Sequence, residues 1–182
     1  MATAFQNQLT NRNFLSPAGF QFSITKTPKV SFFCSSANIP MISFDTNIQP
    51  SYLKDIDIPG EKIDYEDLSI TFLVDENLSN YMAIHNWMTG IGFPESTKDF
   101  KDEVTKPDTT IDMNQQYSDG SLSILNSNYR TNAIVKFKDL FPVALSSLEF
   151  DTGVTDIQYF TAQATFKYLV YNIVAGDGRT KL

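Results

Sequence analysis

The spacing of hydrophobic and polar residues changes near residue 75, and this change predicts a strand directly followed by a helix. Over 68–74 the even positions are all apolar and the odd positions are mixed, which is the pattern of a strand with one buried face. The polar triplet 75–77 can cap a helix. Apolar residues then recur at three- and four-residue spacing, at Tyr81, Ile84, Met88 and Ile91. Gly90, Gly92 and Pro94 end a helix of about three turns, too short to be stable unless it packs on a sheet.

The chain before this unit alternates in the manner of strands. Alternation over 20–24 and 30–34 predicts two strands, with Thr27-Pro28 turning the chain between them, so we expect a hairpin. Weaker alternation over 41–58 predicts a long, partly exposed extended arm. Pro59-Gly60 is a strong turn signal, because proline presets one backbone angle and glycine accepts positive φ. We therefore expect the arm to end at Pro59-Gly60.

The chain after the helix begins with a charged stretch and then returns to strands. Residues 94–119 predict a long loop, of a length that is usually functional or mobile. Alternation resumes over 121–124, 133–138 and 148–171. About seven strands and one helix predict a mainly β fold, an antiparallel β-sandwich or barrel with one flanking α-helix. We expect a single domain over 1–182, with an N-terminal arm at 1–17 and a flexible tail at 175–182.

Composition narrows the function classes. The 182 residues include one cysteine, which excludes an internal disulfide, and they show neither a secretion leader nor an apolar run long enough to cross a bilayer. The formal charge is −7, which argues against a nucleic-acid-binding surface. Nine carboxylates and two lysines lie between residues 45 and 76. This one segment therefore carries the whole charge excess.

Candidate chemistry is sparse. His85 lies beside the apolar stripe of the predicted helix, where a partly buried, hydrogen-bonded histidine is the ordinary case. Cys34 lies in a strand pattern that favours a buried thiol over a nucleophile paired with His85. The carboxylates of Asp64, Glu66 and Asp67 could hold calcium, although a solvated acidic turn is the simpler interpretation. We expect no enzymatic activity, no metal and no cofactor.

The order of several segments resembles a known protein family. The segments are Phe20–Ile24, 30–40, Pro59-Gly60 with Tyr65-Glu66-Asp67, Val74-Asp75-Glu76 before a helix carrying Trp87, and 138–142 before a closing aromatic strand. In this order they resemble the tail tube protein of T-even-type contractile bacteriophages, over about residues 20–173. The long charged loop at 94–119 and the tail at 176–182 depart from that pattern.

The resemblance implies a virion structural protein. It implies hexameric rings whose joined sheets form a continuous barrel, stacked into an inner tail tube through which DNA passes during ejection. It also implies as partners other copies of the chain, the tail sheath protein, tube-initiating baseplate proteins, and the tape measure protein and genomic DNA in the lumen. Synthesis would take place in the host bacterial cytoplasm, without membrane association. The alternatives are a baseplate or secretion-system tube-like subunit, or a soluble β-sandwich carbohydrate-binding module.

The acidic segment is the candidate site for assembly or for the lumen. Its members are Asp55, Asp57, Pro59, Gly60, Glu61, Asp64 and Glu66. One interpretation is that the charges keep the protein soluble or pair with lysines of an adjoining ring. The other is that part of them faces the lumen, where an anionic wall would leave DNA solvated and mobile. A further hypothesis is that the end of the arm touches the next ring.

Overall fold

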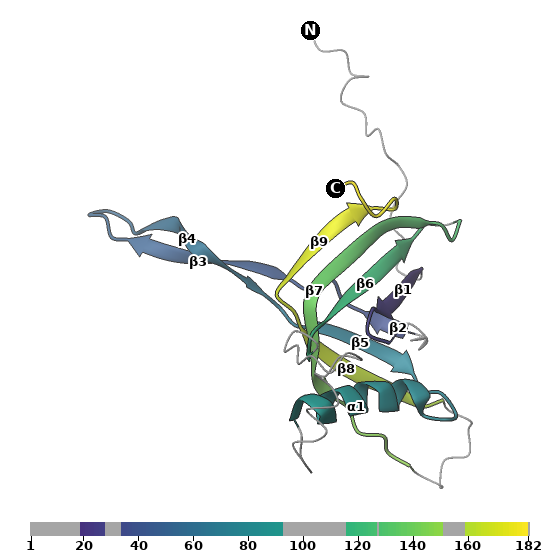
Figure 1. The fold of residues 1–182 in the computed structure, drawn as a ribbon. Coiled ribbons are helices and arrows are strands. Elements are labelled where there is room, and N and C mark those ends of the chain that lie inside the picture. The colour runs from purple at the N-terminus through teal and green to yellow at the C-terminus, as the bar shows by residue number, and fades with distance from the viewer. Residues whose placement is uncertain (1–18, 28–33, 93–115, 127, 151–158, 182) are drawn as a thin grey trace, which may run out of the picture.

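A computed structural model describes residues 19–27, 34–92, 116–126, 128–150 and 159–181 (Figure 1). In this part of the chain nine strands and one helix follow in the order β1–β5, α1, β6–β9. Their bounds are β1 Phe20–Ile24, β2 Cys34–Ala37, β3 Ile42–Gln49, β4 Ile56–Tyr65, β5 Leu68–Leu73, α1 Ser79–Gly92, β6 Ser118–Leu125, β7 Thr131–Leu145, β8 Thr161–Lys167 and β9 Val170–Ala175.

Two antiparallel sheets share the long strand β7. The first half of β7 pairs with β6 and β9, and its second half pairs with β8, so the strand order is β1-β6-β7-β8-β5-β2 with β9 beside β7. Asp139, with φ of 52°, lies between the two halves. The described strands form no closed barrel, and the prediction of a mainly antiparallel β fold with one helix is confirmed.

The core lies between the two sheets and is closed by the helix, which is drawn below them in Figure 1 and contacts β7. Every second residue of β5 and β8 is fully buried, which explains their alternating sequence. Trp87 of α1 lies 6.4 Å from Phe166 of β8 between ring centroids. The indole of Trp87 donates a hydrogen bond to the carbonyl oxygen of Gln116, 2.9 Å away, just before β6.

The predicted helix is present, although its buried face differs from the predicted stripe. The residues it buries are Asn80, Ile84, Trp87 and Gly90, while Tyr81, Met88 and Ile91 are only partly buried. Asn80 is fully buried because it joins the helix to the preceding strand. Its side-chain amide donates to the Leu73 carbonyl oxygen at 2.8 Å, and its side-chain oxygen accepts from the Asp75 backbone amide at 3.2 Å.

One predicted hairpin and one predicted turn are wrong. Phe20–Ile24 does not pair with the next strand: β1 pairs with β6 and β2 pairs with β5, because the residues facing the core find partners far along the chain. Pro59-Gly60 lies inside β4 and does not end the arm; the chain turns at 50–55, between β3 and β4. The same residues that favour turns also suit an irregular strand pairing.

The predicted outer segments lie largely beyond the described residues. The N-terminal arm at 1–17 is outside them, as are residues 94–115 of the loop predicted at 94–119; the end of that prediction is wrong, because β6 already begins at Ser118. Within the predicted tail the Asp177 side chain accepts hydrogen bonds from the backbone amides of Arg179 and Thr180. Those bonds lower the pKa of Asp177 to about 2. The flexibility of this tail stays a prediction.

In the part of the chain that the structure describes, no helix is long and apolar enough to cross a membrane.

Candidate functional site: an exposed hairpin arm

Strands β3 and β4 form a separate two-stranded sheet that projects away from the body of the molecule (Figure 1). Among the described elements, β3 has extensive contacts only with β4. All eight residues of β3 are exposed. Ten residues of β4 at about 3.3 Å each give the arm a length of roughly 33 Å. The extended arm predicted from the sequence is therefore present.

Near its root, one face of the arm is apolar. The cross-strand pairs Ile42 with Tyr65 and Phe44 with Ile63 place large apolar side chains side by side, and Ile48 follows on the same face of β3, opposite Asp57. Phe44 is 49% exposed and Ile48 is 65% exposed. A two-stranded hairpin is at best marginally stable alone in water, and exposed apolar faces of this kind mark interaction sites. This face is therefore a candidate contact surface.

Pro59 and Gly60 lie at an irregularity in the arm. The register shifts between Phe44 and Thr46, and the Thr46 partner is Pro59. A Cβ atom added at Gly60 would lie only 2.6 Å from the Asp45 backbone oxygen, a distance that real Cβ atoms do not show. Glycine at position 60 therefore permits the close approach of the two strands, which is a different role from the predicted turn.

An aromatic cluster holds the root of the arm on the body. The Tyr168 hydroxyl donates to the Glu66 carbonyl oxygen at 2.8 Å, and the Tyr171 hydroxyl donates to the Pro40 carbonyl oxygen at 3.1 Å. Tyr65 packs against both rings, with centroid distances of 6.0 and 5.6 Å. Burial raises the pKa of Tyr168 well above its usual range, and burial together with Tyr65 raises the pKa of Tyr171. The cluster thereby fixes where the arm leaves the body.

The predicted site residues all lie on the second strand of this arm or directly beside it. Asp55 ends the tip turn, Glu66 lies at the root, and the others belong to β4. The acidic members Asp55, Asp57, Glu61, Asp64 and Glu66 are exposed, whereas Gly60 is buried. The Glu66 carboxylate accepts a hydrogen bond from the Met41 backbone amide, at 3.3 Å. The acidic residues therefore lie on β4 and at its two ends. Their lumenal role stays a prediction.

Sequence reasoning missed the apolar face of the arm. It singled out the acidic residues of β4, although the alternation of Ile42, Phe44 and Ile48 was visible. Alternation cannot tell whether an apolar strand face meets the chain's own core or another molecule.

The other candidate residues are His85 and Cys34. His85 is exposed on α1, so its predicted partial burial is wrong. Cys34 packs partly buried against the core, and burial raises its pKa to about 11, which keeps the thiol protonated at neutral pH. Among the described residues, no group of three or more metal-ligating side chains lies close enough to hold a metal ion.

A family model described as phage tail tube protein matches residues 2–174. No curated protein matches the chain significantly.

Solved structures of contractile injection systems contain similar chains. One is the anti-feeding prophage cap, which terminates the tube: 15% identity, a TM-score of 0.63, and coverage of 96% of this chain and 99% of that chain. The sheath-tube complex of the extracellular contractile injection system PVC in its extended state gives 15% identity, a TM-score of 0.60, and coverage of 90% and 93%. The anti-feeding prophage baseplate gives 11% identity, a TM-score of 0.55, and coverage of 92% and 99%. At these identities the likeness shows a shared fold.

Proposed function

The chain belongs to the phage tail tube protein family, and we propose that it is the repeating subunit of an inner tail tube. Six copies close into a ring, and rings stack into a channel that DNA crosses during ejection by a contractile tail. The protein acts as a structural element and catalyses no reaction. Its place is the virion, and it is made in the cytoplasm of the bacterial host.

The exposed arm is the observation that carries this proposal. Its apolar face and its length of about 33 Å suit a contact with a neighbouring copy better than an isolated hairpin in water. The arm places its tip far from the body, so the proposed contact is with the next ring. Burial of the apolar face there would supply the driving force for stacking.

The sheet edges support closure of a ring. In the described chain β1 and β2 end the strand order; β9 pairs with β7 alone among the strands, and the end of its other edge bridges to Lys181. Free strand edges pair readily with other chains unless they are covered or blunted. When identical copies pair, every subunit uses the same two edges. A closed symmetric ring forms if the rotation from one subunit to the next divides a full turn evenly.

The partners follow from this role. A tube inside a contractile tail contacts the sheath protein on its outer surface, baseplate proteins where it begins, and the tape measure protein and DNA in its lumen. The similar chains come from a sheath-tube complex, a baseplate and a terminating cap. The exposed carboxylates Asp55 and Asp57 are the proposed lumenal pair, and an anionic wall would leave the DNA mobile.

Removal of the arm tip tests this function. Replacing residues 50–55 by Asn-Gly, which forms a tight hairpin turn, should leave the thermal unfolding midpoint nearly unchanged because the arm contributes little to the core. The unmodified protein should form rings and tubes in electron micrographs, with or without an initiating baseplate complex, and the shortened protein should stop at rings. Tyr129→Ala, in the exposed β6–β7 turn, is the control. Normal tubes from the shortened protein would show that the tip is dispensable.

The second candidate function is a baseplate or terminal subunit with the same fold. The likeness to a cap and a baseplate chain favours it. Such a subunit would add only one or two rings to an existing tube. The length of tubes assembled from purified protein separates the two: long tubes support the main tube, and single or double rings support the terminal subunit.

A further inference from the structure

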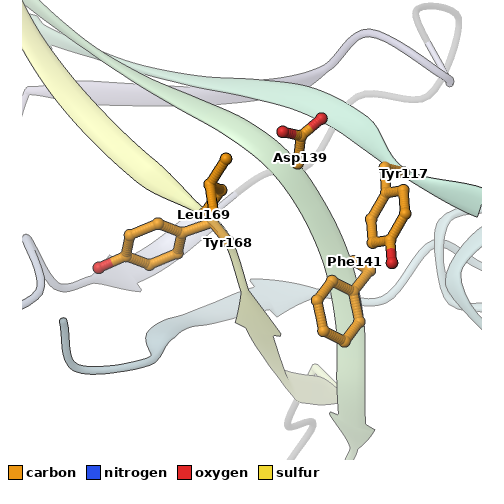
Figure 2. A pocket seen from close by; sticks show the side chains of 5 residues that line it. All are labelled: Tyr117, Asp139, Phe141, Tyr168 and Leu169. Carbon is orange, nitrogen blue, oxygen red and sulfur yellow. The ribbon is translucent and has the colours of Figure 1, made fainter. Parts of the chain in front are cut away.

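An open cavity of about 350 Å³ lies where β7 bends from one sheet into the other. Figure 2 shows its five side chains, which come from the residue just before β6, from β7 and from the β8–β9 turn: Tyr117, Asp139, Phe141, Tyr168 and Leu169. Tyr117 and Phe141 pack edge to face at 5.7 Å, and Leu169 is 67% exposed. The volume is at the lower end of the range of about 300 to 1,000 Å³ that holds small organic groups. One or two side chains would fill it.

The backbone at this cavity is strained and its one charge is available. Asp139 has φ of 52°, in the left-handed region that residues other than glycine adopt at a cost of about 1 kcal/mol or more. Its backbone amide donates to the Asp119 carboxylate at 3.4 Å. The carboxylate of Asp139 itself has no hydrogen-bond or ion-pair partner in the described part of the chain. The cavity therefore combines an apolar aromatic wall with one unpaired anion. It suits an apolar group followed closely by a cation.

The tip of the arm has this composition. Tyr52 is fully exposed and Leu53 is 91% exposed, and Lys54 follows directly. The tip cannot reach the cavity of its own chain, because Tyr168 lines the cavity and also bonds to Glu66 at the root of the arm. The length of the arm, roughly 33 Å, separates the two.

We propose that the tip of one copy, Tyr52 and Leu53 with Lys54, docks in the cavity between Tyr117 and Leu169 of a second copy. Apolar contact and an ion pair between Lys54 and Asp139 hold it there. Since the cavity lies at the root of the arm, a copy displaced by about one arm length presents its own cavity to the tip. The contact is head to tail, so it repeats from copy to copy. This inference rests on the proposed tube function and identifies the surface that receives the arm.

One other segment could occupy the cavity. Tyr129 is 82% exposed and precedes Arg130 in the β6–β7 turn, so it also joins an aromatic ring to a cation. The tip is favoured because it offers two apolar side chains at the end of a projecting arm. Tyr129 serves as the comparison in the test.

Disulfide trapping tests the contact directly. In a Cys34→Ala background, Leu53→Cys with Leu169→Cys should give a ladder of covalently linked multimers after oxidation of assembled protein. Tyr129→Cys with Leu169→Cys, which tests the rival segment, should give none. Tubes without a ladder from the first pair would overturn the docking and leave the tube function standing. A ladder without tubes in micrographs would keep the docking and overturn the tube function.

A double-mutant cycle tests the ion pair. Lys54→Gln and Asp139→Asn should each raise the critical concentration for assembly about two- to fivefold, the effect of an exposed ion pair. Asparagine tolerates positive φ, so the second variant should keep the fold. The double variant should be no worse than either single variant, because the pair is already broken. Independent, multiplying effects would overturn the pairing of Lys54 with Asp139.

Discussion

At the scale of single residues, two tyrosine hydroxyls decide where the arm leaves the body. Tyr168 and Tyr171 donate to backbone carbonyl oxygens of Glu66 and Pro40, on the two sides of the arm's root. Neither carbonyl belongs to a regular strand ladder, so each hydroxyl satisfies an acceptor that the sheets leave open. Burial makes the charged phenolate unfavourable for both rings.

Alkaline pH should weaken the fold through Tyr168. Because the folded-state pKa is raised above the ordinary value of 10.0, the folded protein holds the proton longer than the unfolded chain. The contribution of Tyr168 to the free energy of unfolding should therefore be constant below about pH 10 and fall as the pH rises above it. Tyr168→Phe should lose about 1 kcal/mol at neutral pH and then show a shallower alkaline decline. Urea unfolding from pH 8 to 12 measures both, with Tyr129→Phe as control. Equal slopes for the variant and the unmodified protein would contradict the role of Tyr168.

At the scale of elements, the helix is attached to its neighbouring strand by a buried amide. The sequence suggests a cap at 75–77, yet Asn77 is exposed and Asn80 makes the bonds between α1 and the end of β5. Leu78 takes a left-handed conformation, with φ of 56°, directly before the helix begins. The junction therefore turns sharply, and the side chain of Asn80 substitutes for backbone bonds that the turn cannot make.

Removal of the Asn80 side chain should be costly. Asn80→Ala leaves the Leu73 carbonyl oxygen and the Asp75 amide without their partner inside the protein, so we expect a loss of roughly 2 to 3 kcal/mol in the free energy of unfolding. Asn77→Ala, at the position that the sequence suggests as a cap, should change it by less than about 0.5 kcal/mol. Urea unfolding of both variants gives the comparison. A larger loss at Asn77 than at Asn80 would restore the cap predicted from the sequence.

At the scale of the whole molecule, the charge and the apolar surface gather on the same arm. The same two-stranded sheet carries exposed carboxylates and an apolar face. If identical copies cover each other's apolar faces, their carboxylates also come closer together, and like charges repel. The charges must then face solvent, cations of another copy, or the lumen.

Reversal of two of these charges separates the possibilities. If Asp55 and Asp57 face the lumen, replacing both by Lys should allow tubes to form and slow DNA ejection, more strongly at low salt, because lysines bind phosphates and release counterions. If the carboxylates instead pair with cations of an adjoining copy, the same variant should fail to stack. Micrographs and ejection rates at two salt concentrations give the answer. Normal assembly with an unchanged ejection rate in low salt would show that Asp55 and Asp57 neither face the lumen nor pair with an adjoining copy.

The sequence alone determined the elements whose signals are local. The alternation of Leu68, Ile70 and Phe72 and the three- to four-residue spacing after residue 78 correctly predicted β5 and α1, because these periods reflect geometry within a few residues. The order of short segments also identified the family. The long exposed arm followed from weak alternation and charge.

Only the tertiary structure decided which segments meet. β1 pairs with β6 about 100 residues away and β7 divides itself between two sheets at Asp139, since strand pairing depends on core partners that no local period encodes. The same limit explains why Pro59-Gly60 was mistaken for a turn, because this pair suits a turn and an irregular strand equally. It also explains why the cavity beside Leu169 was missed, because its walls come from three segments far apart in the sequence. Local patterns state what a segment can form, and long-range packing selects its partner.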